Sequence, residues 1–108
     1  MKIAFDLDNT VLTQGSPENN YIDSQVKDGM VEFVNSLYNQ GHEIYFFTAR
    51  HFKHHVYTDN FMRKSGFKFH GIYLNKISVD LFVDDRAFRW EDGKENELSN
   101  LIKNMEIS

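Results

Sequence analysis

The sequence of 108 residues contains no cysteine and a single proline, Pro17. Without cysteine the chain has no disulfide, no thiolate zinc site and no thiol nucleophile, so its stability must come from packing. No uninterrupted apolar run is longer than the four residues Ile44–Phe47, which predicts neither a membrane span nor a secretory signal and favours a cytoplasmic location. Because 16 acidic side chains outnumber 12 basic ones, the net charge of −4 excludes the overall basic field of unspecific nucleic-acid binders.

Apolar residues are present in the amount that one packed core needs. Hydrophobic residues make up 41% of the chain and aromatic residues 15%, and ten residues are phenylalanine. This composition is that of a globular protein and not of a disordered one. A chain of this length is expected to form one domain, residues 1–108.

Segments with the pattern of strands alternate with segments that have the pattern of helices. The apolar residues of 24–40 recur at the spacing of a helix with one buried face, and those of 95–105 follow i, i+3, i+4 and i+7. The alternation predicts an α/β fold, a three-layer, Rossmann-like arrangement in which helices cover an open parallel sheet. The expected strands are 2–7, 43–47, 69–74 and 79–83, and the expected helices are 24–40, 54–65 and 95–105.

Polar clusters follow three of the four expected strands. Asp6 and Asp8 close the first, Thr48 follows the second, and Asp84 and Asp85 follow the fourth. Since a ligand site in an open parallel sheet lies beyond the carboxyl ends of the strands, we expect these clusters to converge. Carboxylates gathered in this way repel one another unless some are protonated or a cation lies among them. A donor set made only of oxygen favours a hard ion such as Mg²⁺.

The order of these residues resembles the haloacid dehalogenase superfamily of phosphotransferases. The resemblance covers residues 2 to about 90 and rests on four motifs: Phe5–Thr10, Thr48 at a strand end, Lys76, and the pair Asp84 and Asp85. It implies a Mg²⁺-dependent phosphomonoester hydrolase that works through an aspartyl-phosphate intermediate. The alternative is a phosphoryl-binding or phospho-accepting regulatory module on the same fold, without turnover.

The resemblance gives each motif a role. It implies that Asp6 is the nucleophile that takes the phosphoryl group and that Asp8 is the general acid and base. Thr48 would donate a hydrogen bond to one phosphoryl oxygen, and Lys76 would neutralise another. Mg²⁺ would let the anionic Asp6 approach an anionic phosphate. Its implied protein ligands are Asp6, the backbone carbonyl of Asp8, Asp84 and Asp85.

Several residues near the motifs keep more than one interpretation. Ala49 and Arg50 follow Thr48 and are expected to bind substrate, but Arg50 could equally balance the acids by ion pairing. The position of the lysine motif varies, so Lys64 and Lys68 are substitutes for Lys76. The histidines could hold a metal, contact the substrate phosphate or a neighbouring chain, or be part of a solvated helical turn; they are His51, His54 and His55.

The intervals between the motifs leave no room for a cap domain. One loop and one helix fill the interval from Thr10 to Thr48, and one helix and one strand fill the interval from Thr48 to Lys76. The chain therefore resembles capless relatives, whose open site implies a bulky substrate or closure by another subunit of a homo-oligomer. A sugar phosphate, a nucleotide and a polynucleotide end all stay open as substrates, and nucleic acid enters only in that role.

Overall fold

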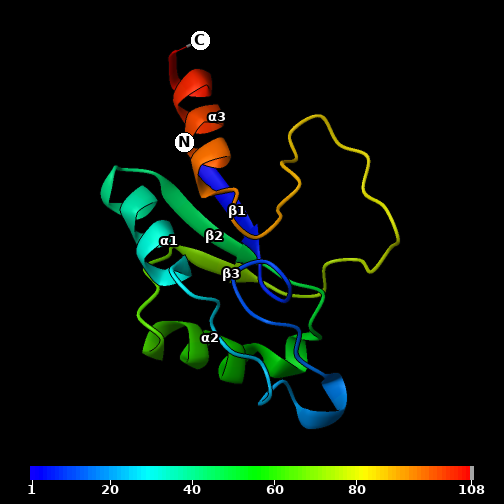
Figure 1. The fold of residues 1–108 in the computed structure, drawn as a ribbon. Helices are drawn as coiled ribbons and strands as arrows, with labels where there is room; N and C mark the ends of the chain where they lie inside the picture. The colour runs from blue at the N-terminus through cyan, green and yellow to red at the C-terminus, as the bar shows by residue number, and fades with distance from the viewer. Residues whose placement is uncertain (108) are drawn as a thin grey trace. The chain divides into compact units, whose positions relative to one another are not determined.

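The computed structural model describes residues 1–107 and divides the chain into two compact units, the first formed by Met1–Ser78 and the second beginning at Val79. The first unit holds a parallel sheet of three strands in the order β1-β2-β3 (Figure 1). The strands are β1 (Lys2–Asp6), β2 (Glu43–Phe47) and β3 (Gly71–Tyr73). The chain is thus an α/β protein with a small, open, parallel sheet.

The helices of the first unit lie between these strands in sequence. They are α1 (Met30–Asn39), between β1 and β2, and α2 (His55–Lys64), between β2 and β3. Two short 3-10 helices accompany them, η1 (Pro17–Asn19) and η2 (Phe52–His54). The alternation of strands and helices predicted for this part of the sequence is therefore confirmed.

The first expected helix begins later than its apolar spacing predicts. The expected range was 24–40, whereas α1 begins at Met30 behind Gly29, whose φ of 77° lies in the left-handed region that favours glycine. The preceding residues pair with the chain that follows β1. Val26 forms an antiparallel bridge with Leu12, and the backbone N–H of Lys27 donates to the carbonyl of Val11. Because these backbone groups are engaged across the loop, they cannot form the first turns of the helix.

Aromatic side chains fill the core against β1 and β2. Phe46 is fully buried, and its ring meets Phe67 and Phe69 edge-on at centroid distances of 5.4 and 5.2 Å. Phe5 meets Phe33 of α1 in the same manner at 6.4 Å. Such edge-to-face pairs stabilise a core beyond the area that they bury. The apolar face of α1 is completed by its buried residues Met30, Val34 and Leu37.

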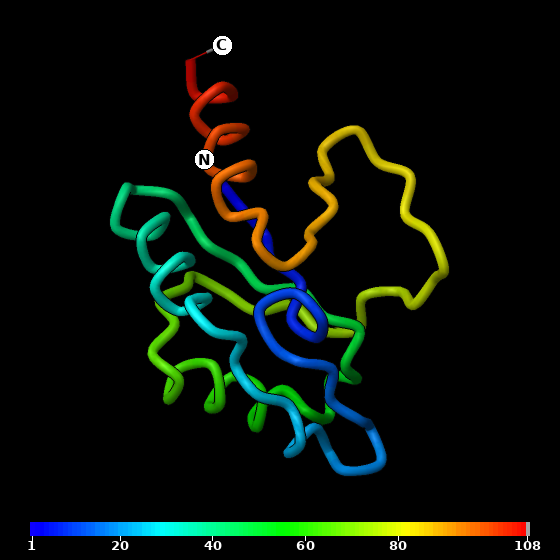
Figure 2. The backbone as a smooth tube through the Cα atoms, viewed as in Figure 1, coloured from blue at the N-terminus to red at the C-terminus, as the bar shows by residue number. Residues whose placement is uncertain are grey.

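The second unit contains one helix and a long irregular segment. The helix α3 (Glu95–Ile107) agrees with the expected range 95–105, and its buried residues Leu98 and Ile102 belong to the predicted apolar stripe. Figure 2 shows residues 79–94 as a trace without helix or strand. Among residues 1–107, no helix combines the length and the apolar character needed to cross a membrane.

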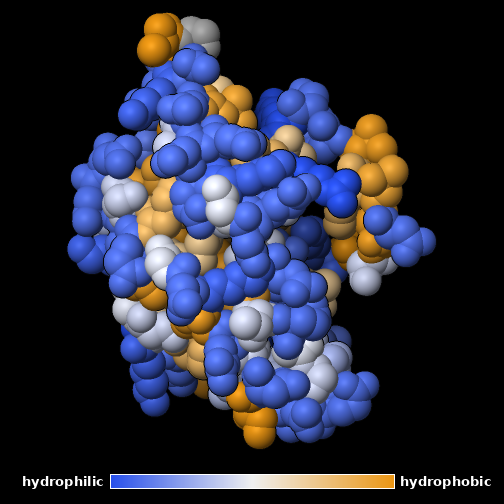
Figure 3. Space-filling view, in the orientation of Figure 1, coloured by the Kyte–Doolittle hydropathy of each residue, from blue (hydrophilic) through white to orange (hydrophobic). Residues whose placement is uncertain are grey.

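The prediction of a fourth strand over residues 79–83 is wrong. This segment is irregular, and Leu81 and Val83 are 73% and 93% exposed. Hydrophobic side chains of this segment are visible on the surface at the right of Figure 3. A strand needs a partner for its backbone hydrogen bonds, and within the described part of the chain no strand pairs with these residues. The third strand is also shorter than its expected range of 69–74, since only Gly71–Tyr73 pair with β2.

Candidate functional site

The ends of the three strands are tied together at one edge of the sheet. Asp6, the last residue of β1, is paired in register with Phe47, the last residue of β2. Thr48 follows directly, and its backbone N–H donates to the carbonyl of Tyr73 at 2.9 Å. The backbone N–H of Lys76 returns the contact by donating to the carbonyl of Thr48, also at 2.9 Å. These bonds carry Lys76 to the edge where Asp6 ends its strand.

Asp6 and Lys76 form an ion pair that is open to solvent. The Nζ of Lys76 lies 3.5 Å from Oδ2 of Asp6, and the two side chains are 20% and 36% exposed, respectively. The other oxygen, Oδ1, accepts the backbone N–H of Leu7 at 2.8 Å. The ammonium also lies 4.1 Å from the centre of the Phe47 ring, a cation–π contact. The structure therefore brings the expected nucleophile and the expected lysine within reach of the same small ligand.

Asp8 lies in a different environment, because a buried arginine binds its carboxylate. Arg50 donates from Nε to Oδ2 at 2.9 Å and from Nη2 to Oδ1 at 2.8 Å. The backbone N–H of Gly15 also donates to Oδ1, at 3.4 Å. The side chain of Arg50 is 1% exposed and that of Asp8 is 14% exposed. Of the two alternatives for Arg50, the structure shows the ion pair.

Two further residues enclose the guanidinium, and sequence reasoning missed both. Nη1 of Arg50 donates to Oγ1 of Thr58 in α2 at 3.2 Å, and Thr58 is fully buried. On another side, the ring of Tyr21 lies 4.1 Å from the guanidinium carbon. Burial, and next the charge of Asp8, raise the pKa of Tyr21 above its usual value. No pattern in the sequence marks Thr58 or Tyr21, since their role depends only on where the buried Arg50 lies.

Tyr21 belongs to a loop that is closed at its base. The backbone N–H of Thr13 donates to the carbonyl of Gln25 at 2.7 Å, and Oγ of Ser24 donates to the carbonyl of Thr13 at 2.9 Å. Tyr21 itself has a φ of 64°, which is rare for an aromatic residue. A conformation of this kind persists only where the surroundings fix it. The loop thus holds the Tyr21 ring against Arg50.

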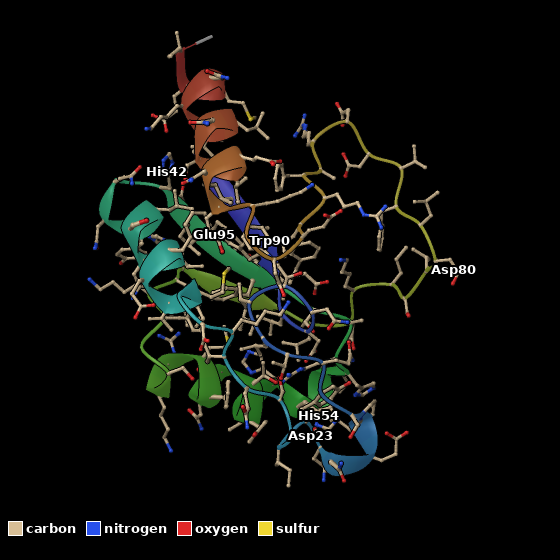
Figure 4. The ribbon with its side chains drawn as sticks, in the orientation of Figure 1. Asp23, His42, His54, Asp80, Trp90 and Glu95 are labelled. Carbon is tan, nitrogen blue, oxygen red and sulfur yellow. The ribbon has the colours of Figure 1, made fainter. Side chains whose placement is uncertain are left out.

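A carboxylate braces the same loop from within. Asp23 accepts the backbone N–H of Ser16 at 3.1 Å and the Ser16 hydroxyl at 3.0 Å. The bond from the backbone N–H of Ser16 is the main reason why the pKa of Asp23 is lower than usual. Figure 4 labels Asp23 together with His54 of η2, whose ring lies edge-on to the Tyr21 ring at 5.1 Å.

The three histidines do not act alike. His54 is 9% exposed, and its burial, followed by the charges of Lys53 and Arg50, lowers its pKa. His51 and His55 are exposed, and Nδ1 of His51 accepts the backbone N–H of Lys53 at 3.1 Å, which caps η2. Their sequence spacing therefore reflects a 3-10 turn followed by the start of α2.

Thr48 and Ala49 occupy contrasting positions after β2. Thr48 is 1% exposed, and its Oγ1 accepts the backbone N–H of Arg50 at 3.2 Å, which leaves the hydroxyl proton to donate elsewhere. Ala49 is exposed. The hydrogen bond that Thr48 is expected to give a phosphoryl oxygen stays a prediction.

The expected metal ligands are divided between the two units. Asp84 and Asp85 are exposed residues of the second unit, and a hydrogen bond from the backbone N–H of Arg86 is the main cause that lowers the pKa of Asp84. Across residues 1–107, no group of three or more His, Cys, Asp or Glu side chains could hold a metal ion. The carboxylate of Asp6 and the backbone carbonyl of Asp8, the ligands expected from the first unit, suit Mg²⁺ in kind, while the carboxylate of Asp8 is bound by Arg50. Metal binding stays a prediction.

Comparison of the chain with protein-family models, with curated proteins and with solved structures found no match. The resemblance to the haloacid dehalogenase superfamily therefore rests on the four sequence motifs alone. Within the first unit, the structure gathers the residues of three of these motifs, Asp6 and Asp8, Thr48, and Lys76.

Proposed function

We propose that the protein is a phosphomonoester hydrolase that forms an aspartyl-phosphate on Asp6. The observation that supports this proposal is the pair of Asp6 and Lys76, with 3.5 Å between Oδ2 and Nζ, at the carboxyl edge of a parallel sheet. An anionic carboxylate can attack an anionic phosphate only where the extra negative charge is offset. Lys76 offers that charge, and its backbone bond to Thr48 fixes the loop that carries it.

The chain's own residues account for both halves of the reaction. An oxygen of Asp6 bonds to phosphorus while the bond to the leaving oxygen breaks, and Asp8 in its acid form gives that oxygen a proton. Water then attacks the phosphorus of the aspartyl-phosphate, gives a proton to Asp8, and releases inorganic phosphate and the free Asp6 carboxylate. Thr48 and Lys76 hold the phosphoryl oxygens. When bound, Mg²⁺ would supply further positive charge, with Asp6, the Asp8 carbonyl, Asp84 and Asp85 as the proposed ligands.

We also propose the three-layer, Rossmann-like arrangement of the haloacid dehalogenase type, without a cap domain. The described chain between β1 and β2 holds only a loop, η1 and α1, and the chain between β2 and β3 holds only η2 and α2. With 36% of the Asp6 side chain exposed, the substrate can be bulky, such as a polynucleotide end. A sugar phosphate or a nucleotide would call for closure by a second copy of the chain. The proposed location is the cytoplasm.

The test is phosphate release from a panel of phosphomonoesters in the presence of Mg²⁺. The panel contains p-nitrophenyl phosphate, sugar phosphates, nucleotides, phosphopeptides and 3′-phosphorylated oligonucleotides. We expect the unmodified protein to release phosphate and Asp6→Asn to lose at least about 100-fold in rate, because asparagine cannot act as the nucleophile. The matched control is Asp59→Asn, since the carboxylate of Asp59 pairs with Arg63 within α2 and not with a residue of the strand ends.

Two results would contradict hydrolysis. One is the absence of phosphate release from every member of the panel, and the other is an Asp6→Asn variant as active as the unmodified protein. If acetyl phosphate or beryllofluoride labels Asp6 stably while no phosphate is released, the protein is instead the phospho-accepting module.

A further inference from the structure

Arg50 is the largest of the fully buried side chains, and it is charged. Burying a guanidinium is costly unless its N–H groups find acceptors and its charge finds a partner. Both conditions are met, because Nε and Nη2 bond to Asp8 and Nη1 bonds to Thr58. A group that is 1% exposed and bonded in this way has no free face for a substrate phosphate.

The contact fixes the orientation of the Asp8 carboxylate. Both of its oxygens accept hydrogen bonds from the planar fork of Arg50, at 2.9 and 2.8 Å. Rotation of the carboxylate about its Cβ–Cγ bond would break both bonds together. The Gly15 N–H, 3.4 Å from Oδ1, adds a third donor from the loop. Proton transfer needs such fixed geometry, since displacement of a reacting group by about 1 Å can reduce the rate about 100-fold.

We infer that Arg50 is a positioning residue for Asp8 and does not bind substrate, and that Thr58 and Tyr21 hold Arg50 in place. This inference rests on the proposed function, because it concerns the group that would move protons in that reaction. Arg50 then acts only through Asp8, so its loss should affect the steps in which Asp8 gives or takes a proton.

Three separate parts of the chain meet where the guanidinium binds Asp8, which is why its position is well defined. Arg50 itself lies just after β2, Thr58 comes from α2, and Tyr21 comes from the loop between β1 and α1. The left-handed backbone of Tyr21, at a φ of 64°, costs free energy that the closed loop must offset. The loop that carries Tyr21 therefore has a function, which is to cover the arginine that orients Asp8.

The test compares two substrates that differ in their need for a proton. The nitrophenolate released from p-nitrophenyl phosphate leaves as an anion, whereas the alkoxide of glycerol phosphate must be protonated as it leaves. The variant is Arg50→Lys, which keeps the charge but loses the fork that grips both oxygens. We expect kcat/KM for glycerol phosphate to fall at least about 100-fold and that for p-nitrophenyl phosphate no more than about tenfold, because general acid catalysis contributes about 10²–10⁴-fold. The KM should not rise by more than about threefold for either substrate, since Arg50 does not contact the phosphate.

Two further variants control the experiment. Arg63→Lys makes the same exchange at an exposed arginine of α2, paired with Asp59, and should leave both rates unchanged. Thr58→Val removes the hydroxyl that accepts from Nη1 of Arg50 and leaves the pair with Asp8 in place. It should reduce kcat/KM less than Arg50→Lys does, but again more for glycerol phosphate. Thermal unfolding followed by circular dichroism shows which variants are folded. If Arg50→Lys does not fold, the two-substrate comparison for Thr58→Val tests whether Arg50 positions Asp8.

Equal losses on the two substrates would overturn the inference, because a general structural defect does not distinguish leaving groups. A large rise in KM with an unchanged kcat would also overturn it, since Arg50 would then bind substrate. If the unmodified protein releases phosphate from neither of these two substrates nor from any member of the panel, the proposed function fails. In that case, and wherever these two phosphates are not substrates, the carboxyl carbon-13 resonance of Asp8 in labelled protein decides the positioning. That resonance should shift in Arg50→Lys and not in Arg63→Lys, and an unmoved resonance refutes the inference.

Discussion

Replacing Asp8 by asparagine should destabilise the protein far more than the same replacement at Asp6. The carboxylate of Asp8 is the charge partner of a guanidinium that is 1% exposed, with hydrogen bonds of 2.8 and 2.9 Å. Removing one member of a buried pair costs about 3–5 kcal/mol, because the other charge stays buried without compensation. Asp6 and Lys76 are 36% and 20% exposed and 3.5 Å apart, and an ion pair so exposed contributes less than about 1 kcal/mol.

The difference is large on the scale of the whole protein. Domains unfold with a free energy of about 5–15 kcal/mol, so Asp8→Asn removes a fifth or more of that stability. The assay is urea denaturation followed by circular dichroism, for the two single variants and for Asp8→Asn combined with Arg50→Met. The double variant no longer buries an unpaired charge and should be more stable than Asp8→Asn alone. Equal destabilisation by Asp6→Asn and Asp8→Asn, or a double variant less stable than Asp8→Asn, would refute the reasoning.

Two other perturbations test the surroundings of the site. Burial, and next the charge of Lys53, lower the pKa of His54, so the folded state disfavours the charged imidazole. The contribution of neutral His54 to the free energy of unfolding should be complete above the pKa of the unfolded state, about 6.5. That contribution should be lost as the pH falls from this value to the lower pKa of the folded state. Urea midpoints at about pH 7.5 and about pH 5.5 should therefore differ less in His54→Gln, and an identical pH dependence would contradict the assignment. Gly15→Ala should lower the free energy of unfolding by about 1–3 kcal/mol, since a Cβ at this position lies 3.0 Å from both Ser24 Cβ and Tyr21 Cδ1. An unchanged melting temperature would contradict this expectation and show that the loop can shift to accommodate the methyl group.

Helices with one buried face could be predicted from the sequence where nothing else competed for their backbone. The range 95–105 agrees with α3, Glu95–Ile107, because Leu98 and Ile102 recur at helical spacing and are buried. The range 24–40 failed at its beginning, because Val26 and Lys27 pair with residues that follow β1. Pairing across a loop is a long-range interaction, and local spacing contains no information about it.

The expected fourth strand failed for a related reason. The segment 79–83 is a short run rich in apolar residues, including Leu81 and Val83, which is the pattern of a buried strand. A strand, however, is defined by its neighbour as much as by its own residues, and the two side chains are 73% and 93% exposed. The sequence shows which segments could join a sheet and does not show which of them do.

The principle that a ligand site lies beyond the carboxyl ends of parallel strands was enough to choose the candidate site from the sequence. The choice among the lysines needed the structure. Sequence spacing allowed Lys64, Lys68 or Lys76, and only the backbone bond from Lys76 to Thr48 explains why Lys76 reaches Asp6. Lys68 instead donates to Asn39 at 3.2 Å. A loop lysine is placed by the turn that carries it, and that turn leaves no pattern in the sequence.

The two carboxylates at the end of β1 differ in what they can tolerate. Asp6 is partly exposed beside the half-buried ammonium of Lys76, as a nucleophile that must reach a substrate requires. Asp8 is fixed by a buried arginine, as a group that must transfer protons over a short distance requires. Stability and proposed catalysis are therefore separable at Asp6 and inseparable at Asp8. A loss of activity in an Asp8 variant combines lost stability with lost proton transfer, whereas the loss in Asp6→Asn reports on the proposed chemistry of Asp6, as nucleophile and metal ligand, without a large change in stability. For this reason Asp6, together with the two-substrate comparison at Arg50, decides the proposed chemistry.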